Sequence, residues 1–141
     1  WLSFKVVQKS TPQIETGTLI DYKLKIHGVP VRWRSKITDW IPNRSFTDIQ
    51  IQGPYKSWKH SHGFESYLGG TLISDRVIYE IPLGKAGKIF AGRKVRKDIE
   101  DIFAYRRSVI DQLFSKKNCL KPTAWQNSKN SYTLVSTNRP M

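Results

Sequence analysis

Two histidines in one short run of the sequence could do chemistry. Four residues alternate within residues 53–65, GPYKSWKHSHGFE: Trp58, His60, His62 and Phe64. Side chains two apart on an extended strand point the same way, so both imidazoles would lie on one face between two large aromatic rings. An imidazole can exchange a proton near neutral pH. A strand that only filled a hydrophobic core would carry apolar residues at these positions, so the pattern indicates a pocket.

A carboxylate interrupts the apolar face of the next predicted strand. After an expected turn at Gly69–Gly70, the residues on that face are Ile73, Asp75, Val77 and Tyr79. A histidine and an aspartate could act as acid and base, so His60, His62 and Asp75 are the candidate catalytic residues. The sequence contains no Gly-rich phosphate loop and no GxSxG, CxxC or HExxH motif, so nothing further indicates catalysis.

Arg106 is the expected counterpart of these groups on a helix. Its angular position falls near the middle of an apolar stripe, between Ile102 and Val109. An unpaired buried guanidinium is costly, so it needs a carboxylate, a ligand anion or a route to water. Asp75 and Asp48 are the candidate partners. Arg106 is therefore predicted either to form a structural ion pair with Asp75 or to bind the carboxylate or phosphate of a ligand.

Asp48 and Gln50 are the remaining polar candidates for the interior. They alternate with Phe46 and face inward if Phe46 does, although Ile49 and Ile51 would then face outward. Three roles stay open for the two histidines: structural core residues, lining of a ligand cavity, or metal ligands. The metal role is disfavoured because His-x-His supplies only two ligands and a third from Asp48 or Asp75 is conjecture. We therefore expect no metal and no cofactor.

Periodicity places these residues on a sheet and a helix. Six strands are predicted: residues 2–8, 18–26, 31–40 and 46–52, followed by two strands within residues 53–82. From about Gly92 to Ser115 the period changes to 3.6, with an apolar stripe of Val95, Ile99, Ile102, Phe103, Val109, Ile110, Leu113 and Phe114. This order predicts an α+β fold in which an antiparallel sheet of about six strands curls around one long helix, with a cavity on its concave side. Residues 1–115 make this domain, and the polar residues 116–141 are predicted to form a mobile tail.

The composition suits one globular domain in the cytoplasm. The 141 residues leave room for one core, no run is long enough to span a membrane, and the single cysteine, Cys119, excludes an intrachain disulfide. The chain begins with Trp1 instead of Met, so we expect the natural product to start upstream. The net charge of +13 favours an anionic partner. Because the basic residues alternate along strands or crowd one helix start, we predict mainly a solvated basic surface; they include Lys23, Lys25, Arg32, Arg34, Lys36, Arg93, Lys94, Arg96 and Lys97.

Five runs of the sequence carry a family resemblance: GTLIDYKLKIHGVPVRWRSKITDW (17–40), FTDIQ (46–50), GPYKSWKHSHGFE (53–65), GGTLISDRVIYEIPLG (69–84) and IFAYRRSVIDQLF (102–114). They resemble bacterial ligand-binding proteins of the SRPBCC superfamily, relatives of START lipid-transfer domains, polyketide cyclases and plant pathogenesis-related allergens. The resemblance implies a helix-grip fold, in which a curved antiparallel sheet grips a long C-terminal helix around a hydrophobic cavity. The family's opening strand and two short helices have no counterpart before Trp1, and the tail after Lys117 has none either. If that opening segment is absent, an open sheet edge would favour a homodimer.

The expected function is binding of a small hydrophobic or amphipathic molecule, such as a lipid, polyketide or isoprenoid, in that cavity. The residues expected to line the site are Trp33, Asp48, Gln50, Trp58, His60, His62, Phe64, Asp75, Val77, Tyr79 and Arg106. A cyclase or dehydratase that uses His60 or His62 as acid or base is one alternative. Binding of nucleic acid or of an anionic membrane through the basic face is the other.

Overall fold

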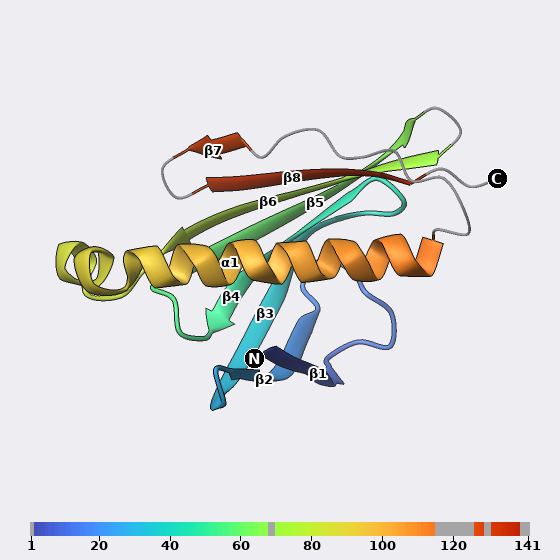
Figure 1. Ribbon diagram of the computed structural model, residues 1–141. Coiled ribbons are helices and arrows are strands. Elements are labelled where there is room, and N and C mark those ends of the chain that lie inside the picture. Colours follow the sequence, from blue (N-terminus) through green and yellow to red (C-terminus); the bar gives the residue numbers. More distant parts are fainter. Residues whose placement is uncertain (1, 68–69, 115–125, 129–130, 139–141) are drawn as a thin grey trace.

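The chain folds into one antiparallel sheet and one long helix, an α+β arrangement (Figure 1). The computed structural model describes residues 2–67, 70–114, 126–128 and 131–138. The strands before the helix are β1 (Leu2–Lys9), β2 (Leu19–Ile26), β3 (Val29–Ile41), β4 (Ser45–Gln52), β5 (Ser57–Tyr67) and β6 (Gly70–Glu80). The helix is α1 (Gly84–Phe114), and β7 (Gln126–Ser128) and β8 (Ser131–Asn138) follow it. The predicted class and the six successive strands are confirmed.

Neighbouring strands of the sheet all pair antiparallel, in the order β1-β2-β3-β4-β5-β6-β8-β7. The last two strands differ from the sequence interpretation, which has no strand after the helix. The run SYTLVSTN of β8 is rich in β-branched residues, and β6 offers it backbone groups that would otherwise remain unpaired at a sheet edge. The rest of the predicted tail, Cys119 included, lies outside the described residues, as does Gly69 of the expected Gly69–Gly70 turn.

The packed core lies between the inner face of β6 and the middle of α1. Val77 and Tyr79 of β6 are buried against Ile99 and Phe103 of the helix. Partly buried apolar residues surround this group: Tyr55, Trp58, Ile81 and Val95. The alternation predicted for β6 is confirmed, because its inner residues are buried while the intervening residues, such as Ile78, are exposed.

The helix begins at Gly84, about two turns before the expected start near Gly92. Its first turns project beyond the strands in Figure 1, and Ile89 and Phe90 on them are strongly exposed. A 3.6-residue apolar period appears only where a helix buries one face, so the sequence pattern could not mark this unpacked start. No helix in the described ranges is both long enough and apolar enough to cross a membrane.

The hairpin turn between β2 and β3 brings that part of the sheet to the helix. His27 and Gly28, the predicted turn between β2 and β3, both have positive φ, as a two-residue hairpin loop with the strand twist requires. Nε2 of His27 lies 2.9 Å from Oδ1 of Asp98 on α1. The tip of this hairpin therefore reaches the helix, and β2 and β3 bend toward the same side as the core.

Candidate functional site

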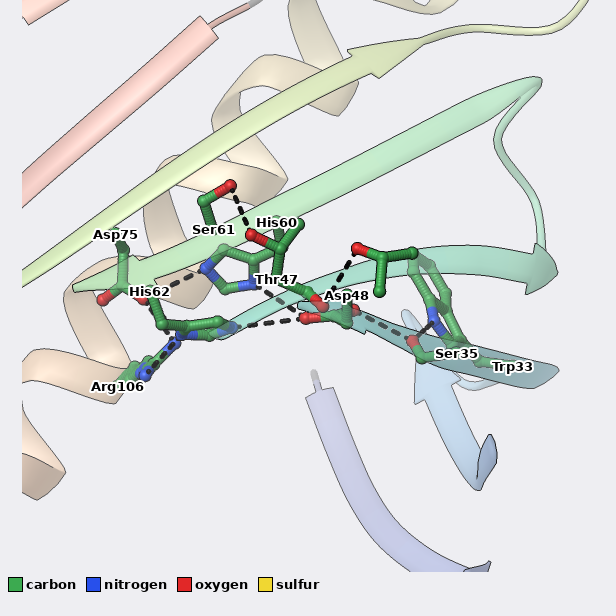
Figure 2. Close-up of polar contacts among 10 residues, drawn as sticks. Trp33, Ser35, Thr47, Asp48, His60, Ser61, His62, Asp75 and Arg106 are labelled. Carbon is green, nitrogen blue, oxygen red and sulfur yellow. Dashed lines mark hydrogen bonds and ion pairs between the residues drawn. The ribbon is translucent and has the colours of Figure 1, made fainter. Parts of the chain in front are cut away.

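Five polar and charged side chains meet between the sheet and α1, and we call them the polar cluster: Asp48, His60, His62, Asp75 and Arg106 (Figure 2). The strand register brings them together. Asp48 of β4 pairs with His60 of β5, and His62 of β5 pairs with Asp75 of β6. Directly paired residues share one face of a sheet, so all four strand residues face the helix that carries Arg106. The predicted inward orientation of these residues is confirmed.

Asp75 is the most buried member of the polar cluster, with 1% of its side chain exposed. Its Oδ1 lies 3.0 Å from Nε2 of His60, 2.8 Å from Nδ1 of His62 and 2.8 Å from Nη1 of Arg106. The predicted pairing of Arg106 with Asp75 is thus confirmed. Burial alone would raise the pKa of Asp75, but the hydrogen bonds with both histidines and the charge of Arg106 outweigh it and lower that pKa. Asp75 is therefore ionised at neutral pH.

Asp48 faces the histidines from the opposite side. Its Oδ2 lies 3.3 Å from Nε2 of His62 and 4.0 Å from Nδ1 of His60. Its Oδ1 accepts a hydrogen bond of 3.0 Å from Ser35, whose Oγ accepts one of 2.9 Å from the indole N–H of Trp33. Ser35 was not among the predicted site residues, although it alternates with Trp33 on β3. This chain of hydrogen bonds fixes the orientation of the Asp48 carboxylate.

The two imidazole rings lie against each other, with centroids 3.7 Å apart. Phe46 stacks on His62 at 3.9 Å, and the edge of Phe103 meets His60 at 5.4 Å. Burial lowers the pKa of His60, although its hydrogen bond with Asp75 acts in the opposite direction. His60 is therefore neutral at pH 7.

Aromatic side chains flank the polar cluster on both sides. Trp33, Tyr55, Trp58 and Tyr79 contact one another on one side, and Trp40, Phe46 and Phe64 do so on the other. Gln50, predicted to line the site, hydrogen-bonds both backbone groups of Tyr55: its Nε2 donates to the carbonyl at 2.7 Å, and its Oε1 accepts from the N–H at 3.3 Å. Gln50 thereby positions Tyr55, an aromatic residue that the strand periodicity did not reveal.

The inner face of the sheet is covered unevenly. On β6, all four inner residues, Ile73, Asp75, Val77 and Tyr79, are buried. On β2 to β4, burial of the inner residues is mixed. Ile20, Ser35 and Ile37 are buried, whereas the other inner residues are partly buried: Tyr22, Leu24, Val31, Trp33, Phe46 and Asp48. Burial and the nearby charge of Asp48 raise the pKa of Tyr22 to about 12, so its hydroxyl keeps its proton. The polar cluster lies at the boundary between these two parts of the sheet.

The basic residues lie on the outside of the molecule. Those that alternate along β2 and β3 and those within residues 93–97 of α1 are exposed, as predicted for a solvated face. Arg34 makes a two-point ion pair with Asp21, and Lys97 pairs with Asp101 one helical turn later. Exposed pairs of this kind contribute little to stability.

The polar cluster can hold an anion through Arg106, and it can exchange protons or coordinate a cation through its imidazoles and carboxylates. In comparisons with known proteins, no family model, no curated protein and no solved structure matches this chain. Its function has to be argued from the side chains themselves.

Proposed function

We propose that this protein binds a small amphipathic molecule, such as a lipid, polyketide or isoprenoid, between α1 and the inner face of β2 to β5. The proposal includes a helix-grip fold and a place in the SRPBCC superfamily, as the resemblance of the five sequence runs implies. The apolar body of the molecule would lie against the half-buried inner side chains of β2 and β3. Its polar end would meet the polar cluster.

One observation carries this proposal. The inner face of β2 to β4 has partly buried aromatic and aliphatic side chains, such as Tyr22, Leu24 and Trp33, beside the buried Ile20 and Ile37. The inner residues of β6 from Ile73 to Tyr79 are all buried. Large apolar residues on the concave side of a sheet would normally be covered, and ligand sites are concave, mostly apolar surfaces with a few convergent polar groups. A bound apolar molecule would cover these residues without any change in the fold.

The accessible atoms of the polar cluster favour a ligand with an anionic end. Arg106 keeps 32% of its side chain exposed, compared with 12% for His60 and 15% for Asp48. A guanidinium can bind a carboxylate or phosphate through two parallel hydrogen bonds. Trp33 would provide flat apolar contact, because it is a large aromatic residue that is only partly buried.

The test is a fluorescence titration with cis-parinaric acid, a fluorescent fatty acid with a carboxylate end, in buffer that contains EDTA. We expect saturable binding with one site per chain. Trp33→Ala is expected to weaken binding at least about tenfold, since a lost aromatic contact is worth roughly 1.5–3 kcal/mol. Arg106→Gln is expected to weaken it by a similar factor through the lost charge-assisted hydrogen bonds.

Tyr105→Ala is the matched control, because Tyr105 is an exposed aromatic residue on α1, the helix that carries Arg106. It should bind the probe as the wild type does. Equal binding by wild type, Trp33→Ala and Tyr105→Ala would show that the probe binds elsewhere and would contradict the proposal.

A further inference from the structure

The two histidines and Asp48 converge as metal ligands do. Each offers one ligand atom, and these three atoms lie within 4.8 Å of one another. Nδ1 of His60 and Nε2 of His62 both face Oδ2 of Asp48. We propose that Asp48, His60 and His62 bind a divalent transition-metal cation. The proposal does not depend on the binding of an amphipathic ligand.

The separations between the ligand atoms suit a shared cation, which would take the place of the hydrogen bond between His62 and Asp48. In a tetrahedral site with metal–ligand distances of about 2.0–2.1 Å, neighbouring ligand atoms are about 3.3 Å apart. Nε2 of His62 is 3.3 Å from Oδ2 of Asp48, and Nδ1 of His60 is 4.0 Å from the same oxygen. The first distance equals that ligand spacing. The second is longer, and a small shift of one side chain would bring it to the same spacing. Both exceed the usual hydrogen-bond distance of roughly 2.7–3.2 Å.

The opposite nitrogen of each ring faces Asp75. Nε2 of His60 lies 3.0 Å from Oδ1 of Asp75 and Nδ1 of His62 lies 2.8 Å from it, as expected for ring N–H groups that point at a carboxylate. Metal-bound histidines usually donate their second ring N–H to such an acceptor, which fixes the tautomer with a lone pair on the metal side. Arg106 holds Asp75, and Ser35 holds Asp48, so both carboxylates are themselves anchored.

Nε2 of His62 either carries a proton that it donates to Asp48 or presents a lone pair to a metal. Its Nε2 could instead carry a proton toward Asp48, with Nδ1 accepting from Arg106 Nη2, but both of those contacts are 3.3 Å long. Nδ1 also lies 2.8 Å from Oδ1 of Asp75, so the tautomer with a proton on Nδ1 would direct that proton at a carboxylate. A proton on Nδ1 leaves the Nε2 lone pair facing the Asp48 carboxylate, a repulsive arrangement that a cation between them would convert into attraction.

The donor atoms of Asp48, His60 and His62 suit a divalent cation. Two imidazoles and one carboxylate suit zinc, iron(II) or cobalt(II) and leave at least one coordination position open. His60 and Asp48 retain small exposed fractions, through which a cation could enter.

The test uses the full chain after EDTA treatment and dialysis, titrated with cobalt(II) and followed by its visible absorption, and with zinc(II) followed by calorimetry. We expect one site per chain with both metals. Asp48→Asn and His62→Gln are expected to weaken binding at least about 100-fold, beyond the 10–100-fold that loss of a supporting residue causes. Asp75→Asn is expected to weaken metal binding only about 10–100-fold, as for loss of a supporting residue.

His27→Ala and Cys119→Ser are the controls, because His27 is the only other histidine and Cys119 the only cysteine of the chain. Both should bind metal as the wild type does. Asp48→Asn keeps an oxygen for the Ser35 hydroxyl, so it decides the question if His62→Gln fails to fold. Absence of wild-type binding, loss of binding in either control, or unchanged binding in Asp48→Asn would overturn the proposal. None of these results would affect cis-parinaric acid binding measured in EDTA.

Discussion

Two halves of the same sheet face meet different partners. The covered half is the inner face of β6, where Val77 and Tyr79 are buried against Ile99 and Phe103 of the helix. The open half consists of the partly buried inner residues of β2 to β4, such as Tyr22 and Trp33, although Ile20 and Ile37 on the same face are buried. One helix covers the first half and leaves part of the second accessible. The difference assigns stability mainly to the covered half and recognition mainly to the open half, with the polar cluster between them.

The largest expected effect comes from the covered half. Phe103→Ala removes a buried aromatic ring and should lower the free energy of unfolding by about 3–5 kcal/mol. Chemical denaturation monitored by circular dichroism measures this change in the free energy of unfolding. Tyr105→Ala, an exposed position one half-turn along the same helix, should change it by less than about 0.5 kcal/mol. Equal losses in these two variants would remove the distinction between the helix faces.

The next effect lies at the boundary of the two halves and depends on pH. Asp75→Asn keeps the shape but removes the charge that holds Arg106 and the histidines, and should cost about 2–3 kcal/mol at neutral pH in metal-free protein. The folded-state pKa of Asp75 lies below its ordinary value of 3.8, so its contribution is present above pH 3.8 and is lost as the pH falls through the lower folded pKa.

Denaturation curves of wild type and Asp75→Asn at pH 7 and at several values below pH 4 measure this dependence. The two proteins should converge in stability only at the acid end of the series. A difference that stays constant across the whole range would mean that the carboxylate charge is not responsible.

A side chain of the open half should matter less for folding. Trp33→Ala should cost about 1–2 kcal/mol, below the 3–5 kcal/mol typical of a fully buried aromatic residue, because Trp33 is only half-buried. The main effect expected of Trp33→Ala is on binding of cis-parinaric acid. A loss of stability as large as that of Phe103→Ala would show that the open half is part of the core, and the comparison would fail.

The smallest effect concerns the hydrogen-bond chain that orients Asp48. Ser35→Ala should lower the free energy of unfolding by about 1 kcal/mol, because it leaves the indole N–H of Trp33 and one oxygen of Asp48 without this partner. Ser108→Ala, an exposed helix position, is the control for loss of a hydroxyl. If both serine variants unfold alike, the chain from Trp33 to Asp48 does not stabilise the fold.

The sequence was informative wherever a periodic pattern coincided with burial. Strand alternation placed Asp48, His60, His62 and Asp75 on one face, and helical periodicity placed Arg106 opposite them. Both inferences needed only local geometry, since side-chain direction follows from residue spacing. The pairing of Arg106 with Asp75 then followed from the cost of burying an unpaired charge.

Features that depend on contacts between distant residues were missed. Tyr55 lies outside any strand and enters the aromatic side of the site through its bonds with Gln50. The pairing of β8 with β6 and the contact of His27 with Asp98 join segments far apart in the sequence. The approach of Asp48 to one ring nitrogen of each histidine depends on the register of β4 against β5, which no period reveals.

Native mass spectrometry of the protein purified without detergent or organic solvent tests the central claim most directly. The account predicts a population one small molecule heavier than the polypeptide, with that molecule recovered by organic extraction and identified as amphipathic. The same mass shift should persist in Tyr105→Ala and be diminished in Trp33→Ala. A bare polypeptide mass in all three proteins, with no extractable small molecule and no binding of cis-parinaric acid, would contradict the account.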